Sequence, residues 1–339
     1  MPALPPSTLD HPRALTTGTL FALAAGLMWG LVFVVPLLLP QYPAALLSMA
    51  RYLAFGLIAL PLGWLDRKRL ATLTRADWLE ALKLSAVGNL LYYLCLAAAI
   101  QRAGAPLPTM LIGTLPVVIA LVSNRRDAAR DGRLPWRRLG PSLLLMAAGI
   151  ALVNHAEWQL LQSQGLASDV PRYAGGALLA VGAVACWTWY PLRNADWLRA
   201  HADRPASTWA TAQGLATLPL ALLGFIAFWA WNAIASGSQL AMPLGPTPLR
   251  FVALMLVTGL FASWLGTLCW NEASQRLPTS LAGQLIVFET LSALAYAFVL
   301  RGQGPSPATA LGVLLLVAGV VWALRARPVK APLPLHVQP

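Results

Sequence analysis

The chain has 339 residues, of which 58% are hydrophobic and only 11% are charged, and its formal net charge is +12. Soluble globular domains carry charge on about a quarter of their residues, so this composition excludes a soluble globule and indicates an integral membrane protein. The surplus of lysine and arginine is accounted for by the topology rule for membrane proteins, so it does not indicate a nucleic-acid partner.

Ten stretches are long and apolar enough to be transmembrane helices, which need roughly 20 residues to cross the hydrocarbon core. In chain order these predicted spans are 17–39, 42–64, 81–101, 105–123, 139–154, 174–192, 206–231, 250–271, 279–300 and 306–324. The first stretch is itself long enough to span, so we expect no cleaved signal peptide. Residues 1–16 and 326–339 are proline-rich and are predicted to be disordered tails.

Basic residues gather on one side of these spans. We assign 18 of the 24 lysines and arginines, Arg301 among them, to the side of the N-terminus. The other side receives Arg102, Arg172, Arg250 and Arg276. Cytoplasmic loops are enriched in Lys and Arg, so the sequence predicts an all-α integral membrane protein with ten transmembrane helices and both termini in the cytoplasm.

The sequence also repeats itself, because residues 94–112 match residues 268–286 without a gap. The matched pairs include Cys95 with Cys269, Gln101 with Gln275 and Arg102 with Arg276, and a weaker match aligns Gly18 with Gly176 and Trp29 with Trp187. We therefore predict two five-helix repeats, 17–154 and 174–325, joined by a loop over 155–173. Because five is an odd number of crossings, the second repeat has inverted topology.

Two charged residues lie inside predicted spans. A carboxylate such as that of Glu289 costs several kcal/mol in the bilayer core unless it is paired, protonated or facing a water-filled cavity, and Arg51 stays charged at any accessible pH. We predict that both line one cavity, either as an ion pair or as separate contacts to a charged or zwitterionic substrate. The alternative is a buried salt bridge that only sets the helix register.

Polar and aromatic side chains at helical spacing surround these two charges in the predicted spans. The candidate substrate-binding residues are Trp29, Arg51, Asn89, Tyr92, Tyr93, Trp187, Gln213, Trp264, Thr267, Asn271, Gln284 and Glu289, and Glu289 is also the candidate for ion coupling. Such polar stripes must face protein or water rather than lipid. They predict a central cavity between the two repeats.

Other kinds of site find little support. The three cysteines fall singly in separate predicted spans and the four histidines in loops or tails, so neither a disulfide framework nor a metal site is expected. No nucleophile elbow, metalloprotease or nucleotide-binding motif is present, so we expect no enzymatic activity and no cofactor. Any energy for transport would have to come from gradients.

The order of several short motifs resembles the EamA-type branch of the drug/metabolite transporter superfamily. These motifs are Trp29-Gly30, Ala50-Arg51-Tyr52, Leu115-Pro116, Phe288-Glu289-Thr290, and Gly312 with Gly319. The sequence departs from the family pattern at Ser123-Asn124-Arg125 and Arg301-Gly302-Gln303, where the family often has Gly-Glu. The resemblance implies a carrier of amino acids, metabolites or drugs in the inner membrane, commonly an exporter, with the substrate between the repeats.

The favoured hypothesis is an alternating-access carrier with a small-molecule substrate, in which Arg51 binds a carboxylate and Glu289 binds an amine or a coupling proton. Membrane lipids are the other expected partners, and the oligomeric state stays open. Two alternatives remain: a structural or assembly subunit without transport of its own, and a lipid-modifying enzyme that would use Glu272 with His155.

Overall fold

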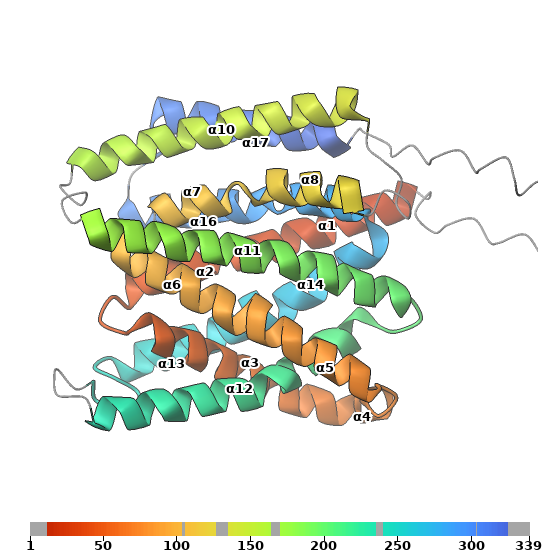
Figure 1. Ribbon diagram of the computed structural model, residues 1–339, viewed down its shortest axis with the longest axis vertical. Helices are drawn as coiled ribbons and strands as arrows, with labels where there is room; N and C mark the ends of the chain where they lie inside the picture. Colours follow the sequence, from red (N-terminus) through yellow and green to blue (C-terminus); the bar gives the residue numbers. More distant parts are fainter. Residues whose placement is uncertain are drawn as a thin grey trace, which may run out of the picture.

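The computed structural model describes residues 12–103, 106–126, 135–163, 170–234, 240–302 and 304–324, and within these ranges every regular element is helical (Figure 1). Residues 12–16, which the sequence assigned to the N-terminal tail, form the first turns of helix α1 (Pro12–Trp29). Proline is favoured in the first turn of a helix because its missing N–H would be unpaired there anyway. The predicted C-terminal tail lies outside the described residues.

The helices follow the apolar stretches of the sequence. Up to residue 163 they are α1, α2 (Leu31–Leu38), α3 (Ala44–Leu65), α4 (Arg67–Leu70), α5 (Arg75–Leu84), η2 (Ser85–Leu91), α6 (Tyr92–Ala103), α7 (Pro106–Ile112), α8 (Leu115–Arg126) and α10 (Trp136–Ser163). From residue 170 they are α11 (Val170–Ala200), α12 (Ala206–Ile234), α13 (Pro248–Val257), η3 (Thr258–Leu265), α14 (Gly266–Arg276), α15 (Thr279–Leu285), α16 (Val287–Arg301) and α17 (Pro307–Leu324).

Seven helical stretches in the described part of the chain are long and apolar enough to cross a membrane. They are 13–38, 44–65, 75–103, 171–200, 206–234, 248–276 and 279–300. Leu139–Val153 and Pro307–Gly319 are shorter apolar helices, and the predicted span 105–123 is divided between α7 and α8. The regular structure of the described residues is thus all helical, and the chain is a multi-pass membrane protein.

The loop predicted over 155–173 is shorter than expected. Helix α10 continues to Ser163 and α11 begins at Val170, and residues 164–169 lie outside the described part of the chain. The segment from His155 to Ser163 is rich in Ala, Glu, Gln and Leu, which are strong helix formers. The polarity that suggested a loop is therefore compatible with a helix that extends beyond the apolar span.

The helices lie side by side, and α10 and α17 form a pair along one edge of the bundle while α12 packs on α3 along the opposite edge (Figure 1). Glycines bring the first pair close together. A Cβ atom at Gly312 would lie 2.8 Å from the carbonyl oxygen of Gly149, and one at Gly319 would lie 2.9 Å from that of Ser142. Such close approach is typical of helix packing in membranes.

We call the end of the bundle where α1 begins the proximal end, and the end where α2 ends and α3 begins the distal end (Figure 1). The predicted sides of two arginines are wrong. Arg276 lies at the proximal end, where its guanidinium sits 5.3 Å from the Phe21 ring centre, and α16 ends with Arg301 at the distal end. The reason is connectivity, since α13, η3 and α14 form one rod that returns to the proximal end.

This correction leaves the charge argument intact because one arginine moves each way. The proximal end also holds the basic helix α4 and the ends of α8 and α11. The predicted numbers of basic residues on the two sides, 18 and 4, therefore stay the same, and so does the positive-inside expectation.

The matched glutamines of the two similar sequence segments make equivalent contacts at opposite ends. Gln101 Nε2 donates to the carbonyl oxygen of Tyr42 (2.6 Å), and its Oε1 accepts from the Ala44 N–H (3.0 Å) at the start of α3. Gln275 Nε2 donates to the carbonyl oxygen of Arg204 (3.1 Å), two residues before α12. Gln101 therefore binds the backbone at the start of α3, and Gln275 binds the backbone just before α12, which is the corresponding helix of the second half.

Alanine at Gln101 or at Gln275 is expected to lower the free energy of unfolding by about 1 kcal/mol, the usual contribution of a hydrogen bond to backbone groups at a helix start. Thermal unfolding in detergent, followed by tryptophan fluorescence, measures the loss. Gln159→Ala is the control, because the Gln159 side chain is exposed and its hydrogen bond in the described part of the chain is to His155 on its own helix. A Gln275→Ala protein as stable as this control would contradict the equivalence of the two contacts.

Candidate functional site

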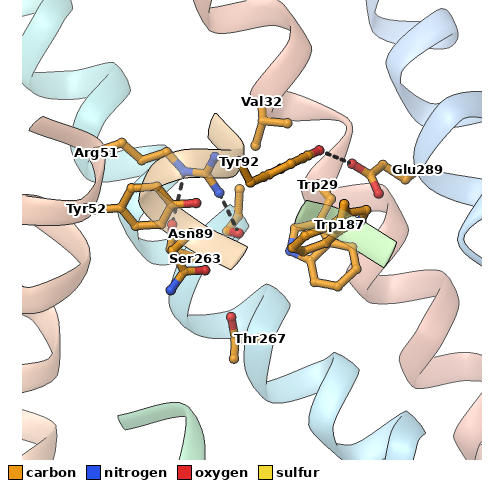
Figure 2. Close-up of a pocket in the computed structure, with 11 residues that line it drawn as sticks. Trp29, Val32, Arg51, Tyr52, Asn89, Tyr92, Trp187, Ser263, Thr267 and Glu289 are labelled. Carbon is orange, nitrogen blue, oxygen red and sulfur yellow. Dashed lines mark hydrogen bonds between the residues drawn. The ribbon is translucent and has the colours of Figure 1, made fainter. Parts of the chain in front are cut away.

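A small, mostly enclosed cavity lies in the middle of the bundle, with room for about one water molecule (Figure 2). Helices from both halves of the chain build its wall. The lining residues are Trp29, Val32, Arg51, Tyr52, Asn89, Tyr92, Trp187, Ala262, Ser263, Thr267 and Glu289. The cavity therefore brings together seven of the twelve residues that the sequence nominated: Trp29, Arg51, Asn89, Tyr92, Trp187, Thr267 and Glu289.

Two π-helical segments, η2 and η3, form part of this wall. The alignment that pairs Gln101 with Gln275 also pairs Asn89 in η2 with Ser263 in η3, and both side chains line the cavity. Wide π turns of this kind are rare and often occur at functional sites. They interrupt the helices α5–α6 and α13–α14 at matched depths, where a polar side chain faces the interior.

Glu289 occupies the first turn of α16. This helix follows directly on α15, and the two are separated by an interruption at Ile286. The start of a helix carries partial positive charge, which favours a carboxylate there. Helix α1 approaches this turn closely, because a Cβ atom at Gly26 would lie 3.0 Å from the Glu289 backbone nitrogen. The sequence thus positions the carboxylate through a broken helix and a glycine on the neighbouring helix.

The Glu289 side chain is buried, with 1% of its surface exposed. Its Oε1 accepts a long hydrogen bond of 3.5 Å from the Tyr92 hydroxyl (Figure 2). Its Oε2 is buried without a hydrogen-bond partner among the residues that the structure describes. An incompletely satisfied carboxylate in the core is costly, so this oxygen is available to a ligand or a proton.

Arg51 reaches the cavity from α3. Its Nε donates to Ser263 Oγ and its Nη2 to the carbonyl oxygen of Ala262, both at 3.1 Å, which ties α3 to η3 (Figure 2). The guanidinium also lies over the rings of Tyr52 and Tyr93, 4.8 and 4.5 Å from their centres, where cation–π attraction stabilises it. Its Nη1 has no hydrogen-bond partner in the described part of the chain.

Arg51 and Glu289 both belong to the described residues, and no ion pair joins them. The buried salt bridge considered from the sequence is therefore absent from this structure. The two charges are separate features of one cavity wall, and each keeps one unpartnered polar atom.

Aromatic rings form another part of the wall. Trp187 stacks on Tyr92 with ring centres 4.6 Å apart, and Trp29 packs edge-on against Trp187 at 4.9 Å. Stacked and edge-to-face aromatic pairs are favourable beyond the area that they bury. The tryptophans that the sequence match pairs, Trp29 and Trp187, thus meet at the centre of the bundle.

Three nominated residues support the cavity from outside or lie near it. Tyr93 lies under Arg51 and directs its hydroxyl to the carbonyl oxygen of Val32 (3.5 Å). Trp264 Nε1 donates to Thr211 Oγ1 (3.2 Å). Gln213 is bound to Tyr190 and Asn194 through its amide.

Two others lie away from the cavity. Asn271 joins Asn194 to the carbonyl oxygen of Ala206. Gln284 accepts from Ser142 Oγ (3.0 Å), which connects α15 to α10. Four lining residues were not nominated, namely Val32, Tyr52, Ala262 and Ser263. Tyr52 and Ser263 carried a usable signal, because one adjoins Arg51 and the other belongs to the polar stripe that includes Thr267.

The pair proposed for lipid chemistry is not assembled. Glu272 forms an ion pair with Arg276, one turn away at the proximal end. His155 contacts Gln159 near the distal end of α10, beyond Val153, which packs on Gly312 near the start of α17. The two residues that an enzyme would need together lie at opposite ends of the bundle.

Comparison with known proteins agrees with this architecture. The model of the EamA-like transporter family matches residues 16–125. The inner membrane protein YtfF of Escherichia coli (strain K12) is 53% identical over 315 residues, which cover 93% of this chain and 97% of YtfF. The chain belongs to the EamA-like transporter family.

The family resemblance predicted from the motifs is thereby confirmed, and it makes this chain a membrane transporter of the drug/metabolite type. A protein crystal structure also superposes with a TM-score of 0.64 at 19% identity, covering 90% of this chain and 96% of the other. At that identity the superposition shows the fold alone. In this EamA-like transporter the cavity between the halves is the candidate binding site.

Proposed function

We propose that this EamA-like transporter is a secondary carrier of the inner membrane that exports a small metabolite, amino acid or drug by alternating access. The observation that carries the proposal is a buried cavity whose wall holds an unpartnered guanidinium nitrogen of Arg51 and an unpartnered carboxylate oxygen of Glu289. Buried polar atoms are nearly always satisfied, and a bound substrate would satisfy both.

The proposed architecture is ten transmembrane helices in two inverted repeats, residues 17–154 and 174–325, with both termini in the cytoplasm. The equivalent contacts of Gln101 and Gln275 at opposite ends support the inversion. Further support comes from Gly18, which packs on Arg276, and from Gly176, which packs on Arg102. The proximal end, which is rich in basic residues, would be cytoplasmic.

In this proposal Arg51 binds a carboxylate of the substrate through its free Nη1. Glu289 binds an amine or carries a coupling proton, because a buried carboxylate that keeps a free oxygen can take either. The tryptophans and tyrosines of the wall would enclose an apolar or aromatic part. Since the cavity holds about one water molecule in this structure, substrate entry requires the two halves to move apart.

The other candidate is a membrane subunit without transport of its own. That alternative predicts that the interior polar groups pair with one another and leave no space. The unpartnered atoms of Arg51 and Glu289 favour the carrier instead.

A ligand-dependent thermal-shift screen of the purified full chain, with amino acids, aromatic metabolites and cationic drugs, tests the proposal. A true substrate is expected to raise the unfolding temperature of the wild type, because a ligand that binds only the folded state stabilises it. Glu289→Gln keeps the volume of the side chain and removes its charge. The apparent affinity for an amine, measured from the dependence of the thermal shift on ligand concentration, is therefore expected to fall at least tenfold. A Glu289→Gln protein with wild-type affinity and wild-type transport in liposomes would contradict this role.

A further inference from the structure

Four buried side chains form a chain of hydrogen bonds that leads from the cavity wall toward the proximal end. The Tyr190 hydroxyl donates to Gln213 Oε1 (2.8 Å), and Gln213 Nε2 donates to Asn194 Oδ1 (3.0 Å). Asn194 Nδ2 then donates to Asn271 Oδ1 (2.8 Å). None of the four is more than 1% exposed. We call this set, Tyr190, Gln213, Asn194 and Asn271, the amide lock.

The amide lock joins three helices at the place where α12 begins. Tyr190 and Asn194 belong to α11, Gln213 to α12 and Asn271 to α14. Asn271 Nδ2 also donates to the carbonyl oxygen of Ala206 (3.3 Å), the first residue of α12. Trp209 Nε1 donates to Asn194 Oδ1 (2.9 Å). These helices cannot separate at the proximal end without breaking buried hydrogen bonds, each of which is costly to leave unmade.

Tyr190, at one end of the amide lock, supports a residue of the cavity wall. The Tyr190 ring stacks on Trp187, with ring centres 5.1 Å apart and planes 3° apart, and Trp187 lines the cavity. Tyr190 has room only because residue 88 is glycine, since a Cβ atom there would lie 2.1 Å from Tyr190 Cδ2. A movement of α12 is therefore transmitted through Gln213 and Tyr190 to the ring that faces the substrate.

The distal end lacks this chain of amides at three of the four matched positions, and the fourth, Gln213, matches Arg51 because the starts of α3 and α12 correspond. The alignment of Trp29 with Trp187 pairs Val32 with Tyr190 and Pro36 with Asn194, and the alignment of Gln101 with Gln275 pairs Ala97 with Asn271. These three side chains are buried and apolar. The buried amide chain of the proximal end therefore has no counterpart at these three positions. Hydrogen bonds at the distal end join other groups, since the Tyr42 hydroxyl donates to the carbonyl oxygen of Leu244 and Gln101 binds the Tyr42 and Ala44 backbone.

We propose that the amide lock is the proximal gate of the cavity, and that Asn194 and Gln213 are the positioning residues that keep it shut. The proposal rests on the function proposed above, because only an alternating-access carrier needs a gate at each end. Loss of the lock shifts the population toward a state open at the proximal end, and the bound substrate is then released or taken up from that side.

The test measures from which side a reporter cysteine in the cavity is labelled. The full chain carries Cys95→Ala, Cys186→Ala and Cys269→Ala, with Thr267→Cys as the reporter, because Thr267 lines the cavity. A charged, membrane-impermeant methanethiosulfonate is added to sealed vesicles of either orientation. Arg69→Cys identifies the vesicles that expose the proximal face, since Arg69 lies on the short helix α4 with a side chain 64% exposed.

Asn194→Ala is expected to raise the rate of labelling from the proximal face about tenfold, the population shift that corresponds to about 1.4 kcal/mol of lost hydrogen bonding. Tyr190→Phe removes a single hydroxyl and is expected to raise it about threefold, a gain that stands even if Asn194→Ala fails to fold. Ser142→Ala is the matched control, because it removes a buried hydrogen bond to Gln284 away from the cavity. Its labelling rate is expected to equal that of the parent.

If folded Tyr190→Phe and Asn194→Ala proteins were labelled from the proximal face at the rate of the parent, the proposal that the amide lock is a gate would be overturned. An equal rise in Ser142→Ala, or a rise from the distal face, would overturn it too. The labelling needs no substrate, which separates this inference from the proposed function. A substrate screen without hits speaks against the carrier, whereas unchanged labelling beside a positive screen speaks against the gate alone.

Discussion

Replacing Arg51 by alanine is expected to abolish substrate binding and transport while the protein still folds. The side chain supplies the only cation among the described residues that line the cavity, and truncating one partner of a buried charged contact lowers affinity by about thirtyfold or more. Folding should survive because a buried arginine bears a desolvation penalty that its two hydrogen bonds and two ring contacts only partly offset. Uptake into liposomes and size-exclusion chromatography measure the two properties separately.

Two further variants sharpen this prediction. Arg51→Lys keeps the charge but loses the planar fork that bonds Ser263 and Ala262 together, so it should bind more weakly than wild type and better than Arg51→Ala. Arg51→Met fills the volume without charge and should fold and fail to bind. Normal transport by Arg51→Ala would remove Arg51 from the site.

The second large effect is expected at Gly30, directly after α1 ends at Trp29, where this end of α1 meets α16. A Cβ atom there would lie 2.7 Å from Ser292 Cβ and 2.9 Å from the Ala293 backbone nitrogen. Gly30→Ala should therefore force the two helices apart and lower the free energy of unfolding by about 1–3 kcal/mol, the usual effect of overpacking. Because α16 also carries Glu289, the apparent affinity for substrate should fall with it.

Gly140→Ala is the matched control for this substitution. Gly140 lies within helix α10, and a Cβ atom there would meet nothing within 4 Å. Alanine is favoured over glycine in helices by roughly 0.5–1 kcal/mol, so this variant should be as stable as wild type or slightly more so. Thermal unfolding in the same detergent compares the two, and equal unfolding temperatures would show that the close approach at Gly30 has no energetic consequence.

The sequence was a good guide to the interior of the bundle wherever the bilayer leaves few choices. A charged side chain inside a span must face protein or water, which is why Arg51 and Glu289 meet at one cavity. The same argument places Asn89, Thr267 and the paired tryptophans around them. Matched residues such as Gln101 and Gln275 predicted equivalent roles, because similar segments fold in similar ways.

Other nominated residues point away from the cavity. Helical periodicity shows which residues share one face of a helix, but it does not show which way that face is turned in the bundle. An extra residue in a π turn rotates everything after it by about 100°, and η2 and η3 introduce such turns before Tyr92 and Gly266. The break at Ile286 likewise separates Gln284 from Glu289, so that one binds Ser142 and the other faces the cavity. Neither irregularity has a signature in composition or spacing.

The sequence by itself determined the membrane location, the apolar helices and the two buried charges, because each of these follows from the free energy of placing side chains in a bilayer. The order of its short motifs indicated the family. Only the tertiary structure decided that Arg51 and Glu289 stand apart, which aromatic rings lie between the helices, and that Asn194 and Asn271 hold α11, α12 and α14 together. Those features depend on the rotation and close approach of helices distant in the chain, which are set by packing at residues such as Gly26, Gly30 and Gly88.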